Sequence, residues 1–469
     1  MIFNNTILQA RAYASFPITI DPLARSKDTL QCIKQQMLTW ASPFNICCFL
    51  DNQGYPGQPS SPTGFECLLA VGAVDSFSAP AGDAFAAFKT WTQTRQDWLF
   101  GHLGYGLAAE TEPAPEAGQA PEDRAAHGVP RKPAHGVPLP DPIGFPDLFF
   151  FVPQTVIELH PDHIRIGTWD ADPEAIWREI ASTGPKEAQA KPSITFTPRF
   201  SREEYLGTID ALRRHILRGD CYEINFCQEF FAQPVVLDPF SVWQALGKAS
   251  PNPFSAFYRL DDRYLCCASP ERFLKKSGAT LLSQPIKGTA PRAHDDAATD
   301  TLRAADLRRS SKDRAENVMV VDLVRNDLAR VCVPGSVRVP ELYGVYPFPH
   351  VHQMISTITG ELLPGAHWTE AIRACFPMGS MTGAPKNRVV RLIAQYERSH
   401  RGLFSGAVGY VTPGDDFDFN VVIRSLLYNS KTKYLSYQVG SGITWYSDPA
   451  AEYEECLVKA AGIKKALAK

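Results

Sequence analysis

The feature of the sequence that most constrains the fold is a change of apolar period near residue 220. From Tyr205 to Ile216, apolar side chains recur at helical spacing, after a capping box that begins at Ser201. Beyond Gly219 the period becomes two, which predicts a strand whose second face carries Glu223, Asn225, Cys227 and Glu229. Two acids and an amide are rarely needed for packing alone, although a solvated face would also explain them.

Helices and strands follow one another in no strict order along the rest of the chain. Apolar patterns predict strands at 100–105, 145–152, 254–258, 264–268, 406–412, 418–428 and 435–439. Helices are predicted at 297–307, 311–328, 369–374, 384–397 and 449–468. Without long repeats or strict alternation, the pattern predicts an α+β fold with large antiparallel sheets rather than a doubly wound parallel sheet.

Two composition shifts divide the 469 residues. Residues 108–142 are crowded with Ala, Pro, Glu and Gly, and the sequence Ala-His-Gly-Val-Pro at 126–130 recurs at 134–138. This composition predicts a disordered insertion within one folded unit. A second shift at 183–192 predicts a link between an N-terminal lobe, 1–185, and a larger catalytic domain, 195–469.

Bulk properties exclude several classes of partner. The formal net charge is −3 and the pI about 6.4, so neither nucleic acid nor an anionic membrane surface is expected as a partner. The N-terminus lacks the pattern of a signal peptide, and no apolar run approaches the roughly 18 residues of a membrane span. Eleven cysteines without metal or redox spacing predict buried, reduced thiols. We therefore expect a soluble, cytoplasmic protein.

Acidic residues at helical spacing are the first candidates for chemistry. Glu452, Glu455 and Lys459 share one face of the predicted C-terminal helix. Glu316 lies near the start of an apolar helix, where a carboxylate needs a cap, a cation or a metal. Mg²⁺ suits such carboxylates. A solvated helix face is the commoner explanation of the C-terminal pair, and the residues alone favour it.

Glycine-rich turns and one lysine complete the candidates. Gly440-Ser441-Gly442 follows a strand and would let backbone amides approach an anion, although a simple turn fits equally. The segment Gly379–Lys386 only superficially resembles a nucleotide-binding loop, because the Gly-Lys-Ser/Thr ending is missing. Lys287 stands between an apolar residue and a glycine. Desolvation there would lower its pKa and free a nucleophilic amine, whereas an ordinary exposed lysine is the commoner case.

The order of these signals is more specific than any one of them. The segments concerned are Ser269–Phe273, Pro285–Arg292, Glu316–Asp327, His350–Ser356, Gly379–Lys386, Phe404–Tyr410, Ile423–Ser425 and Gln438–Ile443. In this order they closely resemble the chorismate-utilising enzymes, which include anthranilate synthase component I and the isochorismate and salicylate synthases. The resemblance covers about residues 200–465. It implies a fold like that of anthranilate synthase component I, with antiparallel sheets packed as a sandwich and flanking helices.

The resemblance also implies a Mg²⁺-dependent site for chorismate, a dianion. Glu316 and Glu455 match metal ligands, with Glu452 next to them. Lys459 and the amides of Gly440, Ser441 and Gly442 match groups that bind the substrate carboxylates. Arg424 and Tyr410 match residues that grip the enolpyruvyl carboxylate, and His352 and Thr382 match positions that line the ring.

Two positions distinguish the products formed within the family. Members that form 4-amino-4-deoxychorismate carry a lysine where this chain has Lys287, and members that form anthranilate carry alanine. Isochorismate-forming members use a lysine on the strand that holds Glu223. The implied mechanism has Lys287 attack C2 of the ring while Glu271 protonates the departing C4 hydroxyl. Ammonia then adds at C4 and expels the lysine.

Several alternatives remain beside that product. They are an anthranilate-forming enzyme of tryptophan biosynthesis, a catalytically silent chorismate-binding subunit, and a lysine Schiff-base enzyme. No cysteine stands at a glycine-flanked elbow of the kind that a glutaminase uses. The resemblance therefore implies a separate glutaminase subunit as the source of ammonia, and no fused lyase domain.

Overall fold

The computed structural model describes residues 10–18, 26–55, 64–112, 139, 141–184, 186 and 192–468. Within them, the strands form two antiparallel sheets. The first sheet has the order β1 (Ala12–Pro17), β8 (His163–Thr168), β7 (Thr155–Leu159), β3 (Cys67–Val71), β2 (Ile46–Asp51), β11 (Phe254–Leu260), β12 (Arg263–Ser269), β21 (Ser425–Asn429), β22 (Tyr434–Ile443), β10 (Glu223–Ala232) and β18 (Gly383–Ala384), with β9 (Thr197–Pro198) beside β10.

The second sheet lies against the first. Its order is β15 (Ile286–Pro291), β17 (Val351–Glu361), β14 (Thr280–Gln284), β13 (Arg272–Ser277), β20 (Phe417–Val421), β19 (Ala407–Val411), β5 (Leu99–Leu103), β6 (Leu148–Val152) and β4 (Asp75–Ala79), with β16 (Arg338–Pro347) beside β17. The packed antiparallel sheets with their helices confirm the predicted α+β sandwich.

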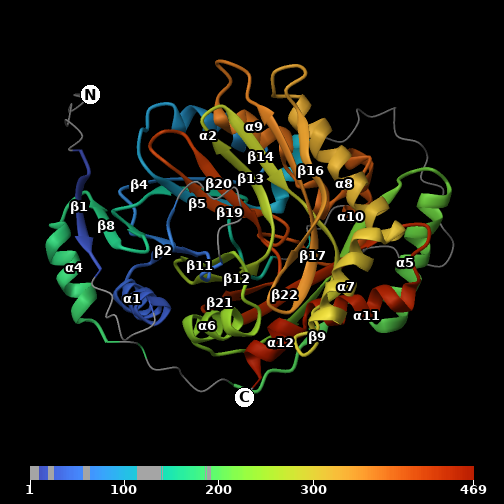
Figure 1. Cartoon of the computed structure of the whole chain (residues 1–469), viewed down its shortest axis with the longest axis horizontal. Helices are drawn as coiled ribbons and strands as arrows, with labels where there is room; N and C mark the ends of the chain where they lie inside the picture. Colours follow the sequence, from blue (N-terminus) through green and yellow to red (C-terminus); the bar gives the residue numbers. More distant parts are fainter. Residues whose placement is uncertain are drawn as a thin grey trace.

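Helices cover the outer faces of the sandwich (Figure 1). Against the first sheet pack α1 (Ser26–Trp40), α4 (Pro173–Ser182), α5 (Arg202–Leu217), α6 (Pro239–Ala249), α10 (Lys386–Tyr396), α11 (Pro449–Lys459) and α12 (Ala461–Leu467). Against the second pack α2 (Ala84–Thr92), α7 (Ala297–Arg309), α8 (Ser311–Ala329) and α9 (Trp368–Cys375).

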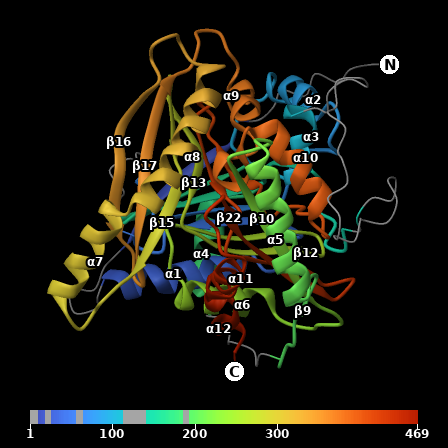
Figure 2. The same ribbon diagram turned by 90° about the vertical axis from the view of Figure 1, so that its right-hand side faces the viewer.

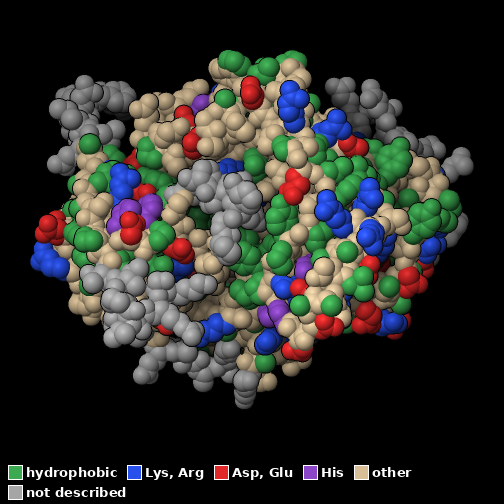
Figure 3. All heavy atoms as spheres, viewed as in Figure 1, with side chains coloured by type: hydrophobic (Ala, Val, Ile, Leu, Met, Phe, Trp, Pro, Cys, Tyr) green, Lys and Arg blue, Asp and Glu red, His purple; other side chains and the backbone are tan. Residues whose placement is uncertain are grey.

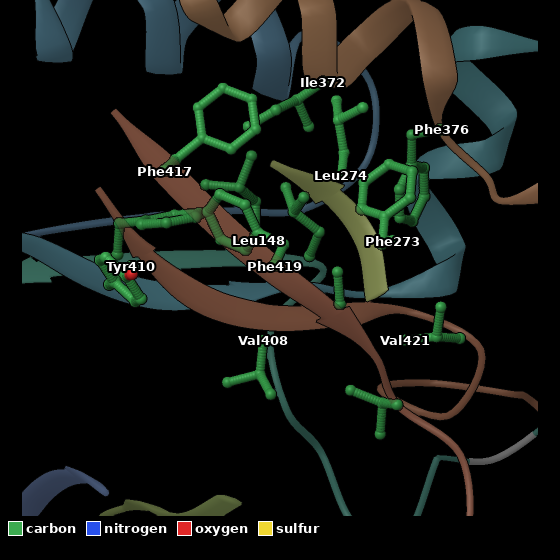
Figure 4. Packing of buried hydrophobic residues seen from close by; sticks show 14 of the residues in the cluster. Leu148, Phe273, Leu274, Ile372, Phe376, Val408, Tyr410, Phe417, Phe419 and Val421 are labelled. Atoms are coloured by element: carbon green, nitrogen blue, oxygen red, sulfur yellow. The ribbon is translucent and has the colours of Figure 1, made fainter. Parts of the chain in front are cut away.

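Strand alternation explains why both faces of the first sheet are apolar. On β2, Cys48 faces the second sheet, whereas Cys47 and Phe49 face the helices. The other side of the second sheet packs in the same way. Figure 4 shows Ile372 of α9 and the following Phe376 reaching toward Phe273 and Phe417 on its strands.

Both sheets draw strands from distant parts of the sequence. The first sheet joins β2 to β11, and the second joins β5 to β19. Each sheet therefore contains strands from both predicted segments, 1–185 and 195–469. Of the predicted insertion at 108–142, residues 108–111 form the short helix α3 (Ala108–Thr111), whereas 113–138 lie outside the described residues.

The predicted helix after Ser201 is confirmed as α5, with both hydrogen bonds of the capping box present. The prediction of one strand at 418–428 is wrong. The chain leaves the second sheet after Val421 and enters the first at Ser425, with Arg424 at a φ of +50° between them. The predicted helix at 449–468 is also divided, at Ala460, because α11 packs on α5 and β22 whereas α12 packs on α6.

The surface mixes charges of both signs. On the face in Figure 3, Lys and Arg side chains lie between Asp and Glu side chains. No helix among the described residues combines the length and the apolar character that a membrane crossing requires.

Candidate active site

Two places where the chain crosses between the sheets hold candidate residues together. One crossing joins β12 to β13 and contains Glu271, and the other joins β20 to β21 and contains Arg424. Backbone hydrogen bonds connect the two crossings. The amide of Val421 donates to the carbonyl of Glu271 over 3.0 Å, and the amide of Ala268 donates to the carbonyl of Arg424 over 3.3 Å. Arg424 has a positive φ, which is uncommon for a residue with a side chain. Such positions cluster at functional sites.

Lys287 lies on β15, where the pairing with β17 shifts register between Ile286 and Thr289. The following Gly288 has a φ of +91°, and a Cβ atom there would lie 2.9 Å from side-chain atoms of Asp313. Glycine is therefore required next to the lysine. The Lys287 side chain is 11% exposed, and its Nζ donates to Oε1 of Glu223 over 2.5 Å.

The charge state of Lys287 differs from the sequence expectation. Burial by itself would lower the pKa of its ammonium group, as the sequence suggests. The negative charges of Glu223, Glu316 and Glu271 more than offset burial and raise the pKa above its ordinary value. The expectation of a free amine is therefore wrong for the protein without substrate, because Lys287 rests as an ammonium ion.

Glu223 reaches Lys287 from β10 of the first sheet, which runs beside β22 (Figure 2). Its side chain is 2% exposed, and its second oxygen, Oε2, is buried without a hydrogen-bond donor among the described residues. Gly442 of β22 makes room for the pair. A Cβ atom there would lie 2.6 Å from Oε1 of Glu223 and 2.9 Å from Nζ of Lys287.

Glu271 has the properties of an acid that is protonated near neutral pH. Burial raises the pKa of its carboxyl group to about 7, while the Ser380 hydroxyl, Lys287 and Arg424 act in the opposite direction. Such a group donates a proton readily at physiological pH. Its charge interacts with those of Lys287 and Arg424, and its role as a general acid stays a prediction.

Glu316 and Glu455 approach the lysine from α8 and α11. Burial raises the pKa of Glu316 to about 7, and the charge of Lys287 opposes that rise. Burial would also raise the pKa of Glu455, but Lys459, whose Nζ lies 2.8 Å from it, more than offsets this and lowers it. The same Nζ donates to the carbonyl of Gly440 over 2.9 Å.

One further acid of α11, Glu452, has a buried carboxylate oxygen. Oε2 of Glu452 is buried and lacks a hydrogen-bond partner within the described part of the chain. Among the described residues, no group of three or more His, Cys, Asp or Glu side chains could by itself hold a metal ion. Mg²⁺ typically takes only one or two protein carboxylates and completes its shell with water and substrate oxygens.

The glycine segment lies at the end of β22. Within the described part of the chain, β21 pairs with β22 over Tyr434–Ser436, and residues 440–442 have β10 as their one strand partner. Ser441 pairs with Phe226, whose side chain lies in the core under the helices. The Ser441 hydroxyl therefore points away from the Lys287 side, and its backbone is the part that borders the site.

The contacts of three further candidates, His352, Thr382 and Arg424, do not involve Lys287. Nε2 of His352 lies 2.9 Å from Asp300 of α7, which also holds Arg292. The Thr382 hydroxyl donates to the carbonyl of Met378 over 2.9 Å. Arg424 forms no ion pair or side-chain hydrogen bond within the described ranges, and its charge lies near Glu271 and Tyr55.

Tyr410 belongs to a neighbouring region. Its ring packs with Phe65, Trp98 and Phe100, and it lines a cavity that also contains Arg272 and Asp418. That cavity includes neither Lys287 nor Arg424. The charges of Glu271, Glu316 and Glu455 thus act on Lys287, and Tyr410 lines the neighbouring cavity.

Sequence reasoning missed two features of this region. The alternation at 222–229 marked Glu223 as unusual, but nothing local signals its contact with a lysine 64 positions later. Gln353 is fully buried opposite Thr289, and neither polar atom of its amide has a partner in the described residues. Lys386, by contrast, is 4% exposed and lies 2.5 Å from Asp327, so it is not available to a phosphate.

Known proteins resemble this chain in sequence and in fold. The chain matches the family model of the chorismate binding enzyme over residues 52–465. A solved structure of anthranilate synthase component I from Streptococcus pneumoniae superposes with a TM-score of 0.69 at 25% identity, covering 88% of this chain and 95% of that one.

Curated relatives agree in sequence over the same region. Aminodeoxychorismate synthase component 1 of Klebsiella aerogenes is 41% identical over 290 residues, which are 61% of this chain and 63% of the relative. The corresponding protein of Escherichia coli K12 is 38% identical over 300 residues, 64% of this chain and 65% of the relative. The matched part thus spans a little under two thirds of these relatives.

Proposed function

Because this chain belongs to the family of chorismate binding enzymes, we propose that it aminates chorismate to 4-amino-4-deoxychorismate, on the route to p-aminobenzoate and folate. It acts as an amino-group transferase. The relatives named aminodeoxychorismate synthase component 1 support this reading, with identities of 41% and 38%.

The observation that carries the proposal is the environment of Lys287. The site of this chain holds a primary amine in hydrogen-bond contact with Glu223, with the acid Glu271 nearby. When the lysine amine adds to C2, ammonia adds at C4 instead. The enolpyruvyl group then stays in the product. The alternative product, anthranilate, requires ammonia itself to add at C2 and pyruvate to be eliminated.

The positively charged side chains of the site would bind chorismate, which is a dianion. The guanidinium of Arg424, which lacks an anionic partner within the described ranges, would hold the enolpyruvyl carboxylate through its planar pair of N–H groups. Lys459 and the edge of β22 would hold the ring carboxylate. Glu316 and Glu455, with Glu452, would hold Mg²⁺, which supplies positive charge against that carboxylate.

The reaction proceeds in two displacements. Lys287 in its amine form attacks C2, the ring double bonds shift, and the C4 hydroxyl leaves as water with a proton from Glu271. Ammonia then adds at C4, the double bonds return, and the lysine leaves. The pKa of about 7 keeps a large fraction of Glu271 protonated at neutral pH.

A separate glutaminase subunit would supply the ammonia. Ten of the eleven cysteines are buried. Burial raises the pKa of all ten thiols, which opposes the thiolate that a glutaminase nucleophile needs. Cys32, the exposed one, lies on α1, which packs under the first sheet and not beside Lys287.

Product analysis tests the proposal. The purified chain is incubated with chorismate, Mg²⁺ and an ammonium salt, and the products are separated by chromatography with mass detection. The expected product is 4-amino-4-deoxychorismate without pyruvate. Fluorescent anthranilate with one equivalent of pyruvate would instead assign the chain to the anthranilate-forming branch.

A further inference from the structure

In its ion pair with Glu223, Lys287 carries a proton that it must lose before it can act as a nucleophile. An ammonium nitrogen has no lone pair, so Lys287 must lose a proton before it can attack C2. The negative charges around it oppose that loss. A base is therefore needed within hydrogen-bond distance of Nζ.

We infer that Glu223 is this base: it takes the proton from Nζ of Lys287 and frees the amine to attack chorismate. The inference rests on the proposed function. Oε1 of Glu223 lies 2.5 Å from Nζ, and no other carboxylate oxygen of the described residues forms a hydrogen bond with it.

The other acids of the site have different tasks. Glu271 must carry a proton to the leaving hydroxyl, and Glu316 and Glu455 would be occupied by the metal ion. Glu223 alone is both in contact with the amine and without an assigned role. The fold fixes the position of Glu223, because β10 holds its carboxylate next to β22 and Gly442 leaves space for that carboxylate.

Burial favours transfer within the pair. Lys287 is the only hydrogen-bond donor to the Glu223 carboxylate among the described residues, and Oε2 has none. A carboxylate held by several donors would keep its charge. Here the transfer converts two buried charges into two neutral groups, which are less costly to keep from water once the substrate closes the site.

The transfers balance over one turnover. The N–H bond of Lys287 breaks and an O–H bond forms on Glu223. The amine forms its bond to C2 as the C4–O bond breaks, and Glu271 supplies the proton of the departing water. Ammonia adds at C4 and the lysine leaves as a neutral amine. Glu223 then returns its proton to Lys287, and the new ammonium group on C4 returns one to Glu271.

The variant Glu223→Gln tests the inference, because glutamine keeps the size and an acceptor oxygen but is not basic. With ammonium as nitrogen donor, kcat at pH 7 is expected to fall by roughly 10² to 10⁴-fold. The ratio of variant to wild-type kcat is expected to rise about tenfold for each pH unit, since the lysine must then lose its proton to water. Taking the ratio removes the common contribution of Glu271.

Glu223→Asp is the matched control, since it keeps a carboxylate on a shorter side chain. Its kcat ratio to wild type should not change with pH. A Glu223→Gln enzyme with wild-type kcat, or one whose loss is equal at all pH values, overturns the inference. Formation of anthranilate by the wild-type enzyme would instead overturn the proposed function, so the two failures are distinguishable.

Discussion

Lys287 and Glu223 come from different sheets, yet the nitrogen of one lies 2.5 Å from an oxygen of the other. This contact joins β15 to β10 across the site, and the negative charge of Glu223 raises the pKa of Lys287.

The first prediction concerns the lysine itself. Lys287→Ala should abolish the covalent adduct and the aminated product while chorismate still binds in a Mg²⁺-dependent manner. Mass spectrometry of the denatured protein after brief exposure to chorismate measures the adduct, and the exposed Lys431→Ala serves as the control.

Glu271 should determine the alkaline side of the pH profile. Its pKa is about 7, and the acid form is the active one, so kcat should fall roughly tenfold per pH unit above that value and level off below it. Glu271→Gln should lose activity by roughly 10² to 10⁴-fold and lose this limb of the profile. A wild-type rate that keeps rising from pH 7 to 9 would argue against an acid role.

Gly442 should tolerate no side chain. The methyl group of Gly442→Ala would displace Oε1 of Glu223 or Nζ of Lys287, and a shift of about 1 Å at reacting groups costs roughly a hundredfold in rate. Gly207→Ala on α5 is the matched control, because its Cβ meets no atom within 4 Å. Steady-state kinetics and thermal unfolding of both variants separate a local effect on the pair from a general loss of stability.

Arg424 should act on binding more than on turnover. Arg424→Lys keeps the charge but loses the planar pair of donors, which is expected to raise KM for chorismate by roughly 10 to 100-fold, equivalent to about 1.5–3 kcal/mol. The measurement is the KM at saturating ammonium. An unchanged KM with a reduced kcat would assign the guanidinium a different task.

Stability should depend on the buried ion pair of Lys386 and Asp327, of which Asp327 lines a small cavity together with Glu271. Lys386 and Asp327 are 4% and 2% exposed. Lys386→Met would leave the buried Asp327 carboxylate with Arg330, which is 45% exposed, as its remaining ion-pair partner among the described residues. The expected loss in the free energy of unfolding is about 1.5–3 kcal/mol, the range for one hydrogen bond to a charged group, because Arg330 still compensates part of the charge. Denaturant unfolding measures it, and the double variant Lys386→Met with Asp327→Leu should recover much of the loss.

The sequence predicts the local elements of this fold well and the crossings poorly. The helix after Ser201 follows from its cap and its period, which are local signals. The apolar run at 418–428 reads as one strand because both halves are buried, and only the packed sheets determine that the chain turns at Arg424 from one to the other. The order of the motifs predicts which residues form the site. It does not predict the charge state of Lys287, because Glu223 lies 64 positions away in sequence.

The pairing of β2 with β11 also has a consequence for biosynthesis. Asp51 pairs with Ser255, so a ribosome adding roughly 5–20 residues per second finishes β2 on the order of 10 to 40 seconds before its neighbour emerges. During that interval β2 presents an open, largely apolar edge to the cell. The nascent chain should therefore depend on a chaperone such as a ribosome-bound holdase, and its yield should fall as translation is slowed across residues 52–254.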